Sequence, residues 1–260
     1  MAVVLLERPS KHIALIRLNR PEAKNALNTE LRALLSQYFL ELNNEPSIRC
    51  IVITGNAEVF AAGADLKEIV DSTSIEIMQR RVLYFWKTIS GCSKPIIAAV
   101  NGLALGGGCE LALNADIIVA GESAKFGQTE VNVGVMPGGG ATQRLVRAIG
   151  KYRAMKMLMT GEVIRAPEAL SMGLISEVVP DTEVLSSALN LAEKIAQMPP
   201  LAIMQIKEVV LAGADVSLDT GLMLERKAFE ILFSSRDQKE GMNAFIEKRK
   251  PLWKGDLVKS

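Results

Sequence analysis

Two glutamates carry the most informative chemistry in this sequence, because each lies in a segment that is otherwise apolar or small. Glu110 follows three glycines at 106–108 and precedes the apolar residues 111–113, while Glu130 ends the small-residue segment 126–130. Burial would raise the pKa of Glu110. Two carboxylates on different loops can share general acid and general base roles at one reacting centre. The pair therefore indicates proton-transfer chemistry.

The glycine run offers a second feature beside Glu110. Glycines at 106–108 would let backbone N–H groups approach a ligand at the positive end of a helix, which is how an oxyanion hole is built. Structural explanations stay open: Glu110 could stabilise a helix N-terminus, and Glu130 could be a solvated loop acid. The run lacks GxGxxG spacing, so dinucleotide binding is only weakly indicated. A second run, 138–140, is most simply a sharp turn into a helix.

Other catalytic machinery is largely excluded by residue counts. His12 is the only histidine and lies near a turn, so the sequence has no Ser-His-Asp or Cys-His set and no zinc spacing. Three cysteines without a CxxC pair are typical of a reduced compartment. A carboxylate-only magnesium site from Asp65, Glu110 and Asp116 is possible in principle, but no spacing favours it. We expect no metal.

Charge and hydropathy limit the kinds of partner that this protein can bind. The 30 basic and 29 acidic residues leave a net charge of +1, which argues against a broad nucleic-acid surface. The longest apolar stretches fall far short of the ~20 residues that span a bilayer. The N-terminal segment lacks the basic leader of a signal peptide. These observations predict a cytoplasmic protein that binds neither nucleic acid nor membrane.

The elements that position the glutamates follow a repeating order. Residues 3–6 and 13–18 predict a hairpin, and 28–42 predict a helix that Asn28 or Thr29 caps. Three buried strands, 51–54, 95–100 and 116–120, each lead into a loop of small residues. Helices are expected after the glycine runs, near 107 and 141. The recurrence predicts an α/β fold of stacked β-β-α turns whose loops converge on one face.

The sequence pattern predicts that the last third of the chain is helical. Residues 184–197, 201–211, 218–233 and 237–248 all have helical apolar spacing. We therefore divide the chain into a catalytic core, residues 1–195, and a helical oligomerisation region, residues 196–260. Apolar helices at a chain end often pack on a neighbouring subunit.

Several motifs together resemble the crotonase, or enoyl-CoA hydratase/isomerase, family, and the resemblance covers nearly the whole chain. They are Leu18-Asn19-Arg20-Pro21, residues 24–27, Phe60-Ala61-Ala62-Gly63-Ala64-Asp65-Leu66-Lys67, Asn101-Gly102 with Gly107-Gly108-Cys109-Glu110-Leu111, Phe126-Gly127-Gln128-Thr129-Glu130, Pro137-Gly138 with Thr142-Gln143-Arg144-Leu145, and residues 240–250. The order and separation of these motifs make the resemblance specific.

The resemblance implies a spiral core, a helical C-terminal part that builds trimers, and a homo-trimer or a homo-hexamer made of two trimers. It implies an acyl-CoA thioester substrate, with coenzyme A belonging to the substrate and no separate cofactor. The thioester carbonyl would be held by the backbone N–H groups of Ala64 and Gly107. Glu110 would orient and deprotonate a water molecule, and Glu130 would supply the proton. Retention of both acids favours hydration over isomerisation.

Further assignments also come from the resemblance. The residues expected to line the coenzyme A path are Lys24, Ala62, Asp65, Leu66, Lys67 and, across a subunit boundary, Lys254. Thr129 replaces a common proline and residues 139–141 are reordered, which puts only the acyl preference in doubt. The segments 53–57, 60–66 and 136–138 look particularly like 2,3-dehydroadipyl-CoA hydratases of phenylacetate catabolism.

Alternatives to that reading stay open. A short-chain fatty-acid β-oxidation hydratase is the nearest one. Trp86, Arg80 and Arg81 could shape the far wall of the acyl pocket or be helix surface. An enoyl-CoA isomerase, an RNA-binding relative using a basic cluster of residues 248–250 with Lys254, and a non-catalytic scaffold are the others.

Overall fold

The computed structural model describes residues 2–256. Its strands are β1 Val4–Ser10, β2 Ile13–Leu18, β3 Cys50–Thr54, β4 Val59–Ala61, β5 Ile96–Val100, β6 Leu103–Leu105, β7 Ile117–Gly121, β8 Lys125–Gly127, β9 Val163–Arg165 and β10 Glu177–Val179. Its α-helices are α1 Thr29–Asn44, α2 Ser74–Gln79, α3 Val82–Ser90, α4 Gly107–Leu113, α5 Ala141–Ile149, α6 Lys151–Thr160, α7 Ala166–Met172, α8 Val184–Ala196, α9 Pro200–Gly213, α10 Leu218–Leu232 and α11 Arg236–Ile246. Short 3₁₀ helices are η1 Pro21–Ala23, η2 Leu66–Glu68, η3 Glu130–Val133 and η4 Asp181–Glu183.

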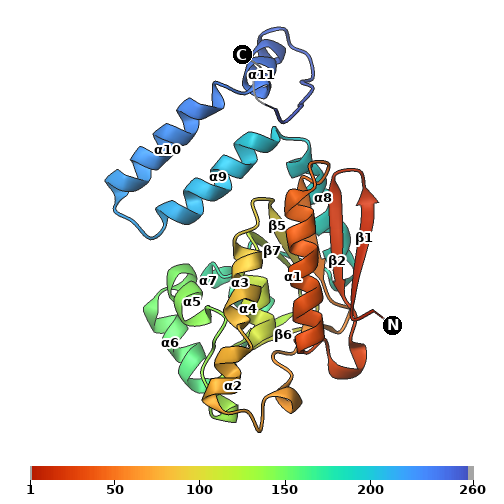
Figure 1. Ribbon diagram of the computed structural model, residues 1–260, viewed down its shortest axis with the longest axis vertical. Coiled ribbons are helices and arrows are strands. Elements are labelled where there is room, and N and C mark those ends of the chain that lie inside the picture. The colour runs from red at the N-terminus through yellow and green to blue at the C-terminus, as the bar shows by residue number, and fades with distance from the viewer. Residues whose placement is uncertain (1, 257–260) are drawn as a thin grey trace.

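The strands form two sheets (Figure 1). The large sheet has the order β1-β2-β3-β5-β7-β10 and the small one β4-β6-β8-β9. In each of the pairs β3/β4, β5/β6 and β7/β8, the first strand joins the large sheet and the second joins the small sheet, parallel to the equivalent strands. Parallel neighbours need crossover connections, and helical segments supply them. The predicted α/β fold of β-β-α turns is confirmed.

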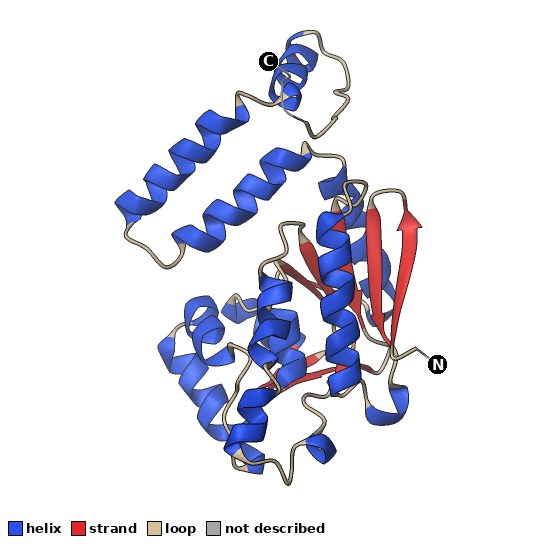
Figure 2. Cartoon of the chain, viewed as in Figure 1, coloured by secondary structure: helices blue, strands red, loops and turns tan. Residues whose placement is uncertain are grey.

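The large sheet is covered on both faces, as parallel sheets usually are. Alternate residues of β3 point to opposite sides, so Ile51 and Ile53 join one buried cluster and Cys50 and Val52 join another. Helices α1 and α3 contribute to the first cluster and α8 to the second, so helices flank the sheet (Figure 2). This packing makes a rigid base for the loops at the ends of the strands.

The predicted N-terminal elements are confirmed. Strands β1 and β2 pair antiparallel as a hairpin. The Asn28 side chain caps α1 by accepting a hydrogen bond from the Leu31 N–H at 2.9 Å.

Helices α9, α10 and α11 extend away from the sheets (Figure 1). No residue of α9 is buried within the described part of the chain, and Ala228 is the buried residue of α10. The Lys207–Asp116 ion pair, 2.7 Å, ties α9 to the core. The predicted boundary between 195 and 196 stays a prediction, and its outer ends, Met1 and residues 257–260, lie outside the described residues. Among residues 2–256, no helix has the length and apolar character needed to cross a membrane.

Candidate active site

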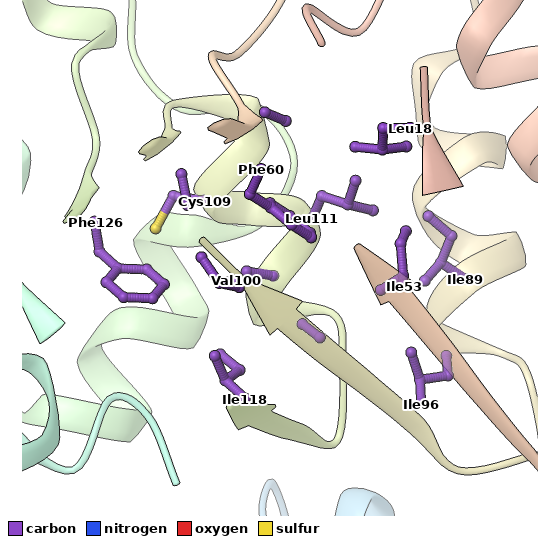
Figure 3. Close-up of a cluster of buried hydrophobic side chains, with 14 of the residues drawn as sticks. Leu18, Ile53, Phe60, Ile89, Ile96, Val100, Cys109, Leu111, Ile118 and Phe126 are labelled. Atoms are coloured by element: carbon purple, nitrogen blue, oxygen red, sulfur yellow. The ribbon is translucent and has the colours of Figure 1, made fainter. Parts of the chain in front are cut away.

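Helix α4, which carries Glu110, packs against the hydrophobic core. The neighbours Cys109 and Leu111 belong to the same hydrophobic cluster as Phe60 and Phe126 (Figure 3). A Cβ atom added to Gly108 would lie 2.0 Å from the Ala61 carbonyl oxygen, so only glycine allows α4 to approach β4 this closely. The backbone of Glu110 is therefore fixed by tight packing.

The Glu110 carboxylate is buried, with 3% of the residue exposed. Its Oε1 accepts hydrogen bonds from the Gly139 N–H at 2.6 Å and the Ala141 N–H at 3.1 Å. Burial raises the pKa of this carboxyl, while the N–H groups of the 139–141 turn and the charge of Arg144 act in the opposite direction. The turn that the sequence presents as a sharp bend is thus also the hydrogen-bond support of Glu110.

The second oxygen of Glu110 lies on the side of Gly139 and Trp86. A Cβ atom added to Gly139 would lie 2.6 Å from Glu110 Oε2 and 2.5 Å from the Trp86 ring. Trp86 itself is 8% exposed. The aromatic ring therefore borders the carboxylate, whose Oε2 has no hydrogen-bond donor within residues 2–256 and can bind a water molecule.

Glu130, at the start of η3, lies beside the glycine run that precedes α4. A Cβ atom added to Gly106 would be 3.1 Å from Glu130 Oε1, and Glu130 Oε2 is buried with no hydrogen-bond partner in residues 2–256. Burial raises the pKa of Glu130 to about 7, and the charge of Glu110 adds to that rise against the opposing effect of the Glu130 N–H. The two predicted carboxylates therefore share one site, with Glu130 the one that readily holds a proton.

The predicted N–H pair also lies together. A Cβ atom added to Gly107 would be 3.6 Å from the Ala64 nitrogen, and one added to Gly63 would be 3.7 Å from the Gly107 nitrogen. Within residues 2–256 neither the Ala64 nor the Gly107 N–H donates a hydrogen bond to another group. Two adjacent backbone donors without an acceptor can bind one ligand oxygen.

The loop that carries Ala64 is held by the segment before α1. The Leu27 N–H donates to the Gly63 carbonyl at 2.8 Å, and the Ala62 N–H donates to the Lys24 carbonyl at 3.0 Å. The predicted coenzyme A residues Lys24 and Ala62 are thereby adjacent to the N–H pair.

The remaining predicted coenzyme A residues are only partly grouped with them. Leu66 and Lys67 are exposed in η2, which begins two residues after Ala64. Asp65 instead forms an ion pair with Arg20, at 3.1 Å, which links the loop of Ala64 to the segment between β2 and α1. The Lys254 N–H donates to Asp237 Oδ1 of α11 at 2.6 Å, and α11 lies at the opposite end of the molecule from the start of α1 (Figure 1). One chain therefore does not bring Lys254 to the site.

The three residues of the alternative magnesium site, Asp65, Glu110 and Asp116, each have separate partners. Asp116 is bound by Lys207 and by the Ile96 N–H, each at 2.7 Å, so it does not join Asp65 and Glu110 in a magnesium site. Residues 2–256 contain no group of three or more metal-ligating side chains.

The other two candidates from the sequence analysis have ordinary partners. In the basic cluster 248–250, Arg249 is paired with Glu240 and Glu247, both at 2.6 Å. This pairing neutralises the charge of Arg249. The His12 ring contacts the Ser47 carbonyl at 2.7 Å and lies outside the site.

Comparison with known proteins identifies the family. The family model for enoyl-CoA hydratase/isomerase matches residues 8–256. A probable mitochondrial enoyl-CoA hydratase of Dictyostelium discoideum is 46% identical over 93% of this chain and 87% of its own length. The 2,3-dehydroadipyl-CoA hydratase of Escherichia coli strain K12 is 45% identical over 98% of this chain and 100% of its own. An enoyl-CoA hydratase structure from Bacillus anthracis superposes with a TM-score of 0.94 at 38% identity, covering 98% of this chain and 100% of that one. The chain belongs to the enoyl-CoA hydratase/isomerase family.

Proposed function

We propose that this protein adds water across the 2,3 double bond of an acyl-CoA thioester, using Glu110, Glu130 and the N–H groups of Ala64 and Gly107. The expectation of an enzyme of the enoyl-CoA hydratase class is confirmed by the family and by the names of its relatives. The observation that carries the residue assignment is the convergence of two carboxylates, Glu110 buried and Glu130 half-buried, on a pair of free backbone donors.

The proposed mechanism divides the reaction among these groups. The Ala64 and Gly107 N–H groups bind the thioester oxygen, where negative charge develops as the enolate forms. Glu110 Oε2 accepts a proton from water while the water oxygen bonds to the β-carbon. Glu130 gives its proton to the α-carbon, and the electron pair of the enolate forms that C–H bond. Glu110 has then gained one proton and Glu130 has lost one, so proton exchange with solvent restores both acids.

The different surroundings of the two acids fit this division of roles. Hydrogen bonds from the 139–141 turn favour the ionised form of Glu110, which a base requires. Glu130 has a buried oxygen without a donor, which favours the protonated form that an acid requires. Isomerisation needs only one acid to move a proton between carbons, so the supported pair favours hydration.

The pH dependence of kcat/KM should follow the protonation of Glu130. With a pKa of about 7, Glu130 loses its proton as pH rises through neutrality. We expect kcat/KM for hydration to fall about tenfold per pH unit above that value, and kcat/KM for the reverse dehydration to fall below it, where Glu130 cannot act as a base. Initial rates in both directions between pH 5 and 9 measure this. A hydration rate that rises steadily through this range would contradict the assignment of Glu130 as the acid.

We further propose 2,3-dehydroadipyl-CoA as the substrate, as in phenylacetate catabolism. The 45% identical relative of that name covers the whole length of both chains, which supports the proposal. Arg81 gives a second argument: it is exposed beside Tyr84, forms no ion pair within residues 2–256, and immediately precedes α3, the helix that carries Trp86. Its cation could bind the terminal carboxylate of the acyl chain. Arg80 is instead bound to Glu68.

The acyl preference can be tested with two substrates of equal chain length. 2-Hexenoyl-CoA and 2,3-dehydroadipyl-CoA differ at the terminal carbon, which is a methyl group in one and a carboxylate in the other. We expect kcat/KM to favour dehydroadipyl-CoA by about tenfold or more, since a charged group that finds a partner is worth over 1 kcal/mol. Crotonyl-CoA serves as the short-chain reference. A preference for the two unsubstituted chains would identify a short-chain β-oxidation hydratase instead.

A homo-trimer or homo-hexamer is proposed for the assembly. The supporting observation is the C-terminal region, where exposed apolar side chains such as Val210, Leu222 and Phe245 have no cover in one chain. Contiguous exposed apolar surface marks an interface with another protein. A neighbouring subunit would also explain how Lys254 reaches coenzyme A. A cytoplasmic location stays a prediction.

A further inference from the structure

Arg144 contacts the helix that carries Glu110. Its Nη2 donates to the Asn114 Oδ1 at 2.8 Å, and the Asn114 Nδ2 donates to the Glu110 carbonyl at 2.8 Å. Asn114 is the C-cap of α4 and is 5% exposed. Among residues 2–256, Arg144 forms no direct ion pair, so its guanidinium is committed to this amide. A cation at a helix C-terminus is also favoured by the helix dipole.

The same side chain contacts the turn that binds the Glu110 carboxylate. A Cβ atom added to Gly140 would lie 3.4 Å from Arg144 Nε, and the Arg144 N–H donates to the Gly140 carbonyl at 2.9 Å. Gly140 has a φ of 112°, which favours glycine, and its neighbours Gly139 and Ala141 supply the two N–H donors to Glu110. Arg144 therefore contacts both α4, which carries Glu110, and the 139–141 turn, which binds the Glu110 carboxylate.

Arg144 is also the nearby positive charge that acts on Glu110. Its charge lowers the pKa of Glu110, against the larger effect of burial. The other titratable groups on this carboxylate are Glu130, from η3, and Cys109, its neighbour on α4. Neither carries positive charge. Asp116 and Arg147 act on Arg144 itself.

We propose that Arg144, together with Asn114, is a positioning residue that fixes the 139–141 turn against α4 and keeps Glu110 ionised as the general base. The proposal rests on the proposed hydratase function for its catalytic meaning. In hydration, the guanidinium would not touch the substrate. It would preserve the charge difference between Glu110 and Glu130 that lets one acid take a proton while the other gives one.

Three variants separate charge from shape. Arg144→Gln keeps an amide donor for Asn114 but removes the charge, and Arg144→Lys restores a charge without the planar fork. Arg147→Gln removes the same charge from the same helix, where Arg147 pairs with Asp215 on the surface, and serves as the control. We expect Arg144→Gln to lower kcat at pH 7 by about tenfold to a hundredfold with little change in KM. Its acidic limb should move to higher pH, because a carboxyl without its cation binds a proton more readily.

A second readout does not depend on turnover. Infrared titration of the Glu110 carboxylate band, assigned by its absence in Glu110→Gln, should show protonation at higher pH in Arg144→Gln than in wild type, with Arg144→Lys and Arg147→Gln close to wild type. If Arg144→Gln loses activity at all pH values without moving the band or the limb, its role is only structural and the proposal is wrong. A wild type without turnover would instead reject the hydratase function, and the infrared titration would still decide the role of Arg144.

Discussion

Glu110→Gln is expected to lower kcat for hydration of crotonyl-CoA by about a hundredfold to ten-thousandfold, the usual contribution of a general base. Glutamine has nearly the same shape, and its oxygen can still accept from the Gly139 and Ala141 N–H groups. The variant should therefore keep the turn in place and lose only the group that takes a proton from water. The decay of the conjugated thioester absorbance measures the rate.

The matched control is Glu122→Gln, which neutralises an exposed carboxylate just after β7. It should hydrate at the wild-type rate. Thermal melting and sedimentation of both variants check that fold and assembly are intact. Equal turnover by Glu110→Gln and wild type would remove Glu110 from the mechanism.

Gly107→Pro is expected to lower kcat by about a hundredfold to a thousandfold, the cost of losing one oxyanion donor. Gly107 is the first residue of α4, a position that tolerates proline because its N–H has no partner within the helix. The substitution therefore removes the proposed donor with little expected damage to the helix. Initial rates of absorbance loss, measured over a range of crotonyl-CoA concentrations, give kcat and KM separately.

Gly107→Ala separates the lost donor from added bulk. Its Cβ atom would meet Leu27 Cδ1 at 3.5 Å and the Ala64 nitrogen at 3.6 Å, which are ordinary van der Waals contacts. The N–H stays, so alanine should retain most of the activity. If alanine and proline lose activity equally, crowding explains the effect and the Gly107 N–H does not hold the thioester oxygen.

Much of the core was predictable because its signals are local and periodic. The β3 segment is a continuous apolar run, as expected of a strand buried on both faces. Asn28 marks the start of α1 by its capping chemistry. Gly108 is required by the close approach of the α4 backbone to Ala61, which explains why a short glycine motif there indicates a site. Both glutamates stand out as carboxylates among small or apolar residues.

The remaining features depend on contacts that no local pattern contains. Strands β9 and β10 have three residues each, too few to show alternation, and they form only by pairing with β8 and β7. The Gly139 and Ala141 donors reach Glu110 across about thirty positions of chain, so their role appears only when the fold brings the turn to α4. The placement of Asp65 against Arg20 and the bond from Arg144 to Asn114 are of the same kind.

The most direct test of the account is the product formed by the wild-type protein from 2-hexenoyl-CoA in water enriched in ¹⁸O, analysed by mass spectrometry without added metal. We predict a 3-hydroxyacyl-CoA with one heavy oxygen on the β-carbon, formed at a rate that Glu110→Gln does not reach. An unhydrated product with a shifted double bond, or recovery of the substrate unchanged, would contradict it.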